Sequence, residues 1–300
     1  MTRVDIALGP LTYNWPADKR RAFYEDIAKQ PVFDMVYMGE TICAKRSAIV
    51  GEAMADSALA LEAAGRKVVY STLSLAITDP ERQAITDVAA DTALLVEGND
   101  TGALRACAGR PHHVGPHVNV YNEGTLDVLA ARGATSICLP WELERASIER
   151  LAARARHHGM VAEVEVFGKA PLAISARCHH ARAYGLAKDG CQYVCGKDLE
   201  GMPVDTLDGE AFLTLNGLQT QADAVTLLVS EIASLVEAGV GRLRLSPLNM
   251  DMGAVAGIYR ALLDGTLDAD VAQERLITLL GDRAVANGFY YGIEGSSFAA

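Results

Sequence analysis

The sequence predicts an α/β fold: a TIM-type (β/α)8 barrel, complete or somewhat irregular, with an insertion after the seventh strand. Three observations support this fold class. The chain has 300 residues, which suits one barrel of roughly 250 residues plus an insertion. Half of the residues are hydrophobic and 22% are charged, so a full core can form without disulfides. Short strand-type runs alternate with helical segments, as parallel strands and their crossovers require.

Eight strands are expected from these runs. They cover residues 4–8, 35–38, 67–71, 92–97, 117–121, 135–139, 160–167 and 242–246. An open, doubly wound sheet remains the alternative, because one or two strands more or fewer would change the architecture.

Residues that typically begin or end helices lie in most of the intervals between these strands. Pro16 and Asp18 open the first helix, and Thr78-Asp79-Pro80-Glu81 is a capping sequence with proline in the first turn. Glycine follows several expected helices, in the position that favours a left-handed residue. The expected helices cover residues 45–64, 123–132, 142–158, 222–238, 255–263 and 271–280, and the glycines are Gly65, Gly133, Gly159 and Gly239.

One connection is anomalous. The seventh strand ends near Phe167 and the eighth begins near Arg242, a gap about three times longer than the others. We therefore predict a single domain over residues 1–300, with an insertion at 168–220 and a small extra strand at 212–215. The insertion has modest apolar content, which fits a lobe that is held partly by a metal.

Composition excludes several classes of protein. The net charge of −11 and the pI near 5.1 argue against a general nucleic-acid binder, which needs a concentration of Lys and Arg. No apolar run reaches the ~20 residues that cross a bilayer, and no hydrophobic region of signal-peptide length is present. We expect a cytoplasmic protein, whose six cysteines are then ligands or buried thiols rather than disulfides.

The cysteines indicate where the chemistry lies. Cys178, Cys191 and Cys195 fall within eighteen residues, on a stretch without helical or strand periodicity. A fourth donor, Cys43, follows the second strand. In a parallel barrel, the loops after strands two and seven emerge on the same face, where active sites are built. The sequence therefore predicts one four-cysteine metal site.

Spacing favours a [4Fe–4S] cluster at this site over zinc. Structural zinc sites bring ligands in close pairs, whereas here twelve and three residues separate the trio and the fourth ligand is more than a hundred residues away. Zinc and four unligated thiols remain as alternatives. His179 and His180 adjoin Cys178 and could replace a thiolate on zinc, but we expect loop residues there. Cys107 and Cys138 are expected to be structural.

No catalytic residue is assigned from the sequence. A nucleophile elbow, a zinc-protease helix, a P-loop and a dinucleotide fingerprint are all absent from the sequence. Polar residues at strand ends would face the barrel mouth and could bind a small substrate, although loop hydrogen bonding explains any one of them equally well. They are Glu40, Asn119, Tyr121, Asn122 and Ser246. The aromatic segment 287–292 is expected to fold back over the barrel or to meet a partner.

Several stretches together resemble a known family. They are Glu165-x-Phe167, Pro171 to Cys178, Asp189-Gly190-Cys191, Cys195, Phe212 to Thr220, Gly39 to Arg46, and Asn287-Gly288-Phe289. These stretches resemble the U32 "collagenase-like peptidase" family, and within it the UbiV branch of oxygen-independent ubiquinone biosynthesis. The resemblance spans nearly the whole chain. It implies that Cys43, Cys178, Cys191 and Cys195 hold a [4Fe–4S] cluster.

The resemblance also implies a function. A member of this branch would form a heterodimer with a UbiU-like paralogue and support hydroxylation of the ubiquinone ring precursor without molecular oxygen. Prephenate is the oxygen donor associated with this system, and a lipid-binding accessory protein would deliver the precursor. Typical U32 peptidases carry His-Gly shortly after Glu-x-Phe, where this chain has Gly168-Lys169. This departure counts against proteolysis. A U32-type peptidase or a zinc-stabilised scaffold subunit nevertheless remains the alternative to the iron–sulfur subunit.

Overall fold

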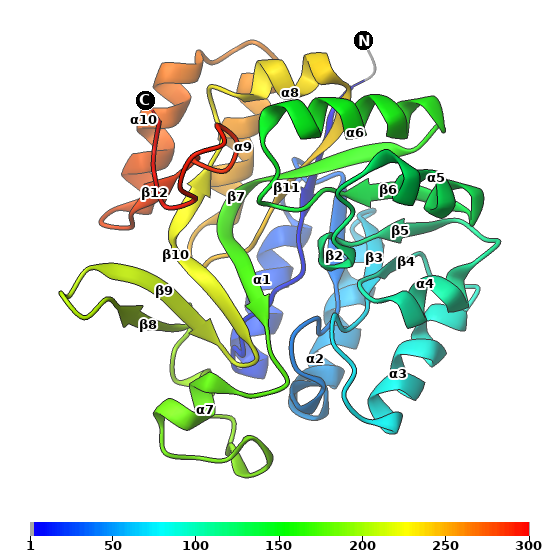
Figure 1. Ribbon diagram of the computed structural model, residues 1–300, viewed down its shortest axis with the longest axis vertical. Coiled ribbons are helices and arrows are strands. Elements are labelled where there is room, and N and C mark those ends of the chain that lie inside the picture. Colours follow the sequence, from blue (N-terminus) through cyan, green and yellow to red (C-terminus); the bar gives the residue numbers. More distant parts are fainter. Residues whose placement is uncertain (1–2, 300) are drawn as a thin grey trace.

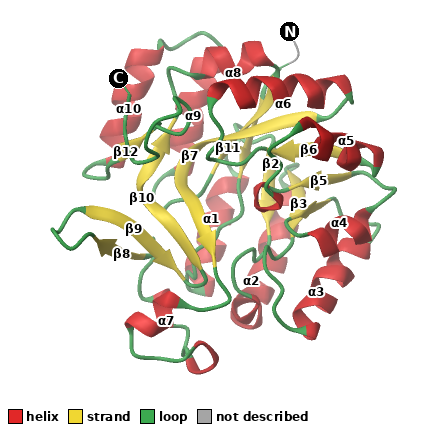
Figure 2. Ribbon diagram, viewed as in Figure 1, coloured by secondary structure: helices red, strands yellow, loops and turns green. Residues whose placement is uncertain are grey.

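The centre of the computed structural model, which describes residues 3–299, is a closed barrel of eight parallel strands (Figures 1 and 2). The strands are β1 (Asp5–Leu8), β2 (Met35–Met38), β3 (Lys67–Ser71), β4 (Val96–Gly98), β5 (His112–Val114), β6 (Ala134–Cys138), β7 (Val161–Ile174) and β11 (Val240–Leu245). β11 pairs in parallel with both β7 and β1, which closes the barrel. The predicted TIM-type fold is confirmed.

Helices cover the outside of the barrel. They are α1 (Ala17–Ala28), α2 (Ala44–Ala63), α3 (Asp79–Ala90), α4 (Thr101–Cys107), α5 (Glu123–Ala131), α6 (Arg145–His157), α8 (Ile232–Ala238), α9 (Met252–Leu263) and α10 (Ala269–Leu280). The predicted capping box forms between Thr78 and Glu81 at the start of α3. The glycines predicted to follow helices all have positive φ. No helix of the described residues is long and apolar enough to span a membrane.

The prediction for the fifth strand was wrong. β5 is His112–Val114, whereas Pro116–Val118 forms a short 3-10 turn and Asn119 is left-handed, with φ of 58°. Pro116 cannot donate to a strand ladder, and this favours the turn. β4 is also shorter and later than predicted, because residues 92–95 precede it as a turn. Helix α4 was not predicted from the sequence.

The helix predicted for residues 222–238 was also wrong over its first half. Residues up to Leu227 belong to β10 (Gln219–Leu227), and only α8 is helical. β10 pairs with β7 on one side and with β9 (Ala211–Asn216) on the other. Within the segment predicted as helical, Val225 to Leu227 pair with β7, and Val225 and Thr226 also pair with residues 285 and 286 near the chain end, so these ladders override the local helical pattern.

A lobe extends from the barrel through β7. This strand continues to Ile174 and forms an antiparallel sheet with β10, β9 and β8 (Met202–Asp205), which lies at the lower left of Figure 1. Residues 168–174, expected in the insertion, therefore extend β7, and the extra strand expected at 212–215 is β9. The cysteine segment, residues 178–195 with Cys178, Cys191 and Cys195, lies between β7 and β8 and includes α7 (His179–Ala183). The chain end folds back, where β12 (Val285–Ala286) pairs with β10 and Tyr290 is buried.

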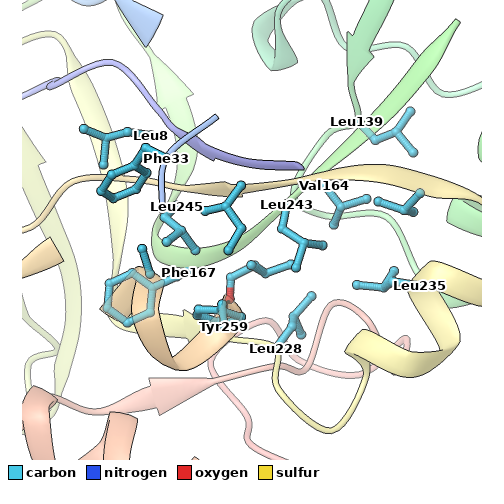
Figure 3. Close-up of a cluster of buried hydrophobic side chains, with 14 of the residues drawn as sticks. Leu8, Phe33, Leu139, Val164, Phe167, Leu228, Leu235, Leu243, Leu245 and Tyr259 are labelled. Atoms are coloured by element: carbon cyan, nitrogen blue, oxygen red, sulfur yellow. Dashed lines mark hydrogen bonds between the residues drawn. The ribbon is translucent and has the colours of Figure 1, made fainter. Parts of the chain in front are cut away.

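The apolar core lies between the barrel and its helices. Figure 3 shows Val164, Leu243 and Leu245 on the outward face of their strands, packed near Tyr259 of α9. The Tyr259 hydroxyl donates a hydrogen bond to the carbonyl oxygen of Val166, at 3.0 Å. Because alternate residues of a strand point to opposite faces, the residues between these point into the barrel.

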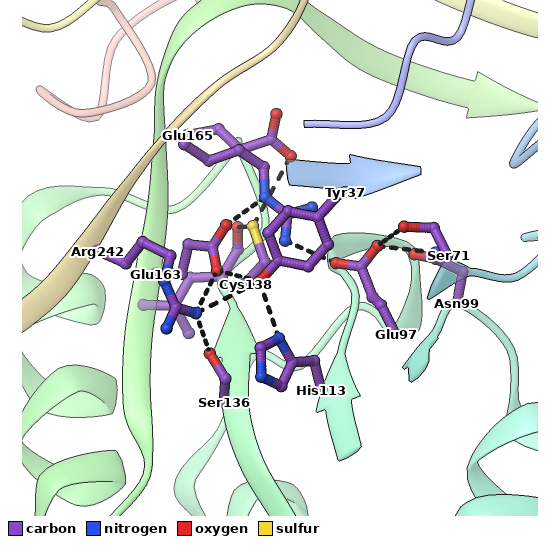
Figure 4. A network of polar contacts seen from close by, with 12 residues as sticks. Tyr37, Ser71, Glu97, Asn99, His113, Ser136, Cys138, Glu163, Glu165 and Arg242 are labelled. Carbon is purple, nitrogen blue, oxygen red and sulfur yellow. Dashed lines mark hydrogen bonds and ion pairs between the residues drawn. The ribbon is translucent and has the colours of Figure 1, made fainter. Parts of the chain in front are cut away.

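The barrel interior is charged. Arg244 of β11 bonds Glu97 of β4 at 2.6 Å and also contacts Glu163 of β7. Arg242 donates to Glu163 at 3.1 Å, and the Tyr37 hydroxyl donates to the same carboxylate at 2.7 Å (Figure 4). Burial alone would raise the pKa of Glu163, but the two guanidinium groups outweigh it and lower the pKa to about 2. The network thus joins strands from around the barrel.

We expect Glu163→Gln to lower the free energy of unfolding by about 3–5 kcal/mol, because it leaves two buried guanidinium groups without their shared carboxylate. Urea denaturation at neutral pH measures this change. Glu149→Gln is the matched control, since Glu149 pairs with Arg145 on the surface. The control should change stability by less than about 1 kcal/mol. Equal changes in the two variants would contradict this account of the barrel interior.

Candidate metal centre and barrel mouth

The four predicted cysteines line one hollow. Cys43, which immediately precedes α2, and the trio Cys178, Cys191 and Cys195 of the lobe surround a space of about 370 Å³. The structure thus brings together thiols from two distant parts of the chain.

Local hydrogen bonds fix the loops that carry the thiols. The Glu40 carboxylate accepts from the backbone N–H groups of Ile42 and Cys43, at 2.9 and 3.0 Å. Cys178 caps α7, where its Sγ accepts from the N–H of Ala181 at 3.4 Å. Between Cys191 and Cys195 the chain turns through Gln192 and Tyr193, which have φ of 48° and 54°. A left-handed conformation is costly for such residues, so this turn is held by its surroundings.

The two histidines beside Cys178 do not line the hollow. His180 is fully buried; its Nε2 lies 2.8 Å from the Asp198 carboxylate, and its Nδ1 lies 3.0 Å from the carbonyl oxygen of Leu215. His180 therefore anchors α7 to β9. His179 and His180 belong to this short helix rather than to a loop.

Cationic side chains face the thiols. Lys45, Arg46 and Lys188 line the hollow. Arg46 is buried, and its guanidinium donates to the carbonyl oxygen of Thr12 at 2.6 Å and to Asn216 at 2.9 Å. Burial raises the pKa of the Cys43 thiol, and the charge of Arg46 opposes this effect. Lys45 is also paired with Asp189 at 2.9 Å, and Arg46 lies 3.7 Å from the Glu40 carboxylate, so only part of this positive charge would offset the charge of a thiolate site.

The donor set fits an iron–sulfur cluster. Four thiols are a complete ligand set for a [4Fe–4S] cluster, and the Asn14 side-chain amide donates to Cys195 Sγ at 3.4 Å, as expected around ligating sulfurs. Within residues 3–299, no three Cys, His, Asp or Glu side chains are grouped closely enough to hold a single metal ion. The thiols instead face the hollow from its walls.

The two remaining cysteines, Cys107 and Cys138, are both buried. Cys107 is buried among the apolar side chains of α3 and α4. Cys138 is buried on β6, but it points into the barrel, where its Sγ lies 3.7 Å from Glu165 Oε1.

A second cavity, of about 460 Å³, lies at the barrel mouth beyond the carboxyl ends of the strands. Glu165 of β7 faces it, accepts a hydrogen bond from Ser246, and is 6% exposed. Burial raises the pKa of Glu165 to about 7, and the nearby Arg244 opposes this shift. The carboxyl group therefore exchanges its proton near neutral pH, which suits an acid–base group.

Of the polar residues expected at the mouth, only Ser246 lines this cavity. Asn119 and Tyr121 line an adjoining groove of about 800 Å³. Glu40 holds the Cys43 turn, and Asn122 caps α5 by accepting from the N–H of Thr125 at 2.8 Å. For these two side chains the structure shows the alternative, hydrogen bonding within their own loops.

Sequence reasoning missed the charged side chains inside the barrel. They are Glu97, Glu163, Arg242 and Arg244, with Lys169 at the mouth. A signal was present: Glu163 and Glu165 alternate with apolar residues in one strand, and Arg242 and Arg244 do so in another. In a barrel whose outer face is covered by helices, alternate polar positions must face the interior.

We expect Glu165→Gln to stabilise the protein at about pH 8 and to change little at about pH 4. An unfolded glutamate has a pKa of about 4.3, whereas burial raises the native pKa to about 7. The unfolded chain therefore releases this proton at lower pH than the native chain, so native stability falls as pH rises from about 4 to 7. The gain in unfolding free energy at about pH 8 is at most about 4 kcal/mol.

Urea denaturation of wild type and variant at both pH values checks this expectation. Glu274→Gln on α10 is the control, because Glu274 is exposed and far from the barrel interior. An equal effect of Glu165→Gln at pH 4 and pH 8 would show that Glu165 does not keep its proton in the native state.

Comparison with known families matches residues 20–298 to peptidase family U32. Among solved structures, the chain is similar to dihydropteroate synthase from Thermus thermophilus, at 16% identity and a TM-score of 0.43, over 87% of this chain and 94% of that one. It is also similar to the tryptophan synthase complex from Pyrococcus furiosus, at 11% identity and a TM-score of 0.41, over 94% of this chain and 100% of that one. The chain is also similar to phospho-2-dehydro-3-deoxyheptonate aldolase from Thermotoga maritima, at 11% identity and a TM-score of 0.36, over 94% of this chain and 71% of that one.

Proposed function

The chain belongs to peptidase family U32, and within this family we propose that it is an iron–sulfur protein of the UbiV branch. Cys43, Cys178, Cys191 and Cys195 would hold a [4Fe–4S] cluster. The protein would act as one subunit of a heterodimer with a UbiU-like paralogue, in oxygen-independent hydroxylation of the ubiquinone ring precursor. One observation carries the proposal: thiols from two distant segments line a single hollow.

The surroundings of the hollow support a redox cluster. When bound, a [4Fe–4S] cluster supplies one-electron transfer. The protein contributes four thiolates, the positive charges of Lys45, Arg46 and Lys188, and an N–H donor to Cys195. Positive charge and hydrogen bonds to the sulfurs favour the more negative, reduced state.

The local structure after β7's Glu-x-Phe motif argues against proteolysis. At this place, where typical peptidases of the family carry His-Gly, a Cβ on Gly168 would lie 2.6 Å from Ser246 Cβ, so the position requires glycine. The Lys169 ammonium group that follows bonds Thr214 at 2.9 Å and Asp223 at 3.2 Å. An ammonium group held in this way does not replace an imidazole base.

Four thiolates occupy every iron of such a cluster, so the site is suited to relaying electrons rather than to binding a substrate on iron. We therefore assign the relay to this subunit and the hydroxylation chemistry to the pair. The oxygen donor would be prephenate, and a lipid-binding accessory protein would deliver the precursor.

Anaerobic purification tests for the cluster. We expect a brown protein whose visible spectrum has a broad absorption band at about 400 nm, with about four irons and four sulfides per chain. Cys178→Ala should lose the cluster because it removes one ligand, whereas Cys107→Ala should keep it, since Cys107 lies in the core of α3 and α4. A colourless wild type with one zinc would instead indicate a zinc-stabilised scaffold or hydrolase.

The reconstituted pair tests the relay. We expect turnover of the ring precursor by the pair and none by this subunit alone. Introducing Cys178→Ala should abolish turnover by the pair, because electrons then have no route through this subunit. Turnover by the isolated subunit, or full turnover by a pair that lacks this cluster, would refute the relay.

A further inference from the structure

An open groove lies beside the hollow that the four thiols line. It has a volume of about 850 Å³, and Arg177, Arg182 and Leu186 are among the residues that line it. Cys178 and Lys188 line both the groove and the hollow, so Cys178 lies in the wall between them. Arg177 and Arg182 are exposed, and the groove belongs to the part of the lobe around α7, at the bottom of Figure 1. The groove therefore leads from the surface to a ligand of the proposed cluster.

The groove is basic, although the protein as a whole is acidic. The chain has a net charge of −11, whereas residues 176–197 contain four basic residues and one acidic residue. The four are Arg177, Arg182, Lys188 and Lys197. Within residues 3–299, none of the three that line the groove, Arg177, Arg182 and Lys188, forms an ion pair. Such a concentration of positive charge attracts an acidic partner.

The carboxylates nearest to the groove already have other partners. Asp189 is paired with Lys45 at 2.9 Å. Asp198 lies 2.8 Å from His180 Nε2, and it accepts a hydrogen bond from the Tyr184 hydroxyl group at 2.9 Å. These contacts hold the lobe together, and they leave the two arginines of the groove facing solvent.

Exposed aromatic side chains lie next to these charges. Tyr184 adjoins Gly185, which lines the groove, and Tyr193 lines the hollow. The two tyrosines are 38% and 37% exposed, and Lys197 Nζ lies 5.1 Å from the centre of the Tyr184 ring. Arginine and tyrosine are enriched in interfaces between proteins relative to the rest of the surface. This composition suits a protein partner better than a small anion.

A nucleic acid is the other class of acidic partner. Binding to its backbone needs Lys and Arg along an extended track. Outside residues 176–197, this chain has an even larger net negative charge than it has as a whole, so a long polyanion that ran past the groove would be repelled. A compact acidic protein can contact the groove alone, and the transient complexes of redox proteins have small interfaces.

We propose that the groove docks an acidic one-electron carrier protein of the plant-type ferredoxin class, which delivers electrons to the cluster. In each transfer the carrier is oxidised by one electron and the cluster is reduced by one electron; no bond forms or breaks, and no proton moves. The rate of such a transfer falls steeply with the distance between the two redox centres, and the groove places the carrier against Cys178. The inference rests on the proposed function for the cluster, and it adds the source of the electrons.

Calorimetric titration of the anaerobically purified protein with oxidised plant-type ferredoxin tests the docking. We expect saturable binding that weakens as salt is raised from about 20 to about 200 mM, because salt screens the attraction. Arg177→Glu and Arg182→Glu should each weaken binding about three- to tenfold, because each replaces an attraction by a repulsion. Arg275→Glu on α10 is the matched control. It changes the net charge equally on an exposed position far from α7 in Figure 1, and it should bind as wild type does.

Two further variants separate charge from folding. Arg182→Lys keeps the positive charge and should bind ferredoxin within about twofold of wild type. Arg182→Gln removes the charge without placing a carboxylate beside the thiols, and it should bind more weakly than Arg182→Lys. Iron and sulfide counts in every variant check that the cluster is kept.

Stopped-flow mixing with excess reduced ferredoxin tests the delivery of electrons. We expect the visible absorption of the cluster to fall as it is reduced, more slowly in Arg182→Glu than in wild type and Arg275→Glu. Absence of any reduction in wild type would overturn the delivery.

The remaining outcomes also decide the inference. Equal binding of ferredoxin by wild type and both glutamate variants, binding that does not respond to salt, or tighter binding of an RNA oligonucleotide at the same salt would overturn it. The titration is repeated with the reconstituted pair, where loss of binding would show that the paralogue covers the groove and would also overturn it. A brown wild type that does not bind ferredoxin overturns this inference and leaves the cluster standing, whereas a colourless wild type overturns the proposed function itself.

Discussion

The ion pairs of Arg244 inside the barrel are the constraint on which the rest of the structure depends. A guanidinium group removed from water is stable only when its carboxylate partners are in place, and here these come from β4 and β7. The partners meet Arg244 only when the strands have their native register. The network therefore couples barrel closure to register, and it forms the floor of the barrel-mouth cavity, which Glu97 and Arg244 both line.

β7 connects this constraint to both candidate sites. Inside the barrel it carries Glu163 and Glu165, and beyond the barrel it continues to Ile174 and leads directly into the cysteine segment. Gly168 permits close approach to Ser246 at the point where the strand leaves the barrel. The direction of one strand thus places the lobe thiols opposite Cys43, which is held by the loop after β2.

The hollow and the barrel-mouth cavity share a wall. Arg46 lines the hollow and donates to the carbonyl oxygen of Thr12 and to Asn216, while Thr12 lines the cavity. Asn216 also bonds Gln219, another cavity residue, at 3.4 Å. One hydrogen-bonded layer therefore separates the hollow from the cavity.

The sequence by itself determined the fold class and the α3 capping box, because periodicity and capping depend on residues close together in the chain. It also selected the four cysteines that line the hollow. It could not locate β5 or the start of β10, since their strand conformation depends on ladders with distant partners that override local pattern. Nor could it show that Glu40 and Asn122 bond their own loops. Only the tertiary structure decided which charged residues face one another in the barrel, because those contacts join strands far apart in the chain.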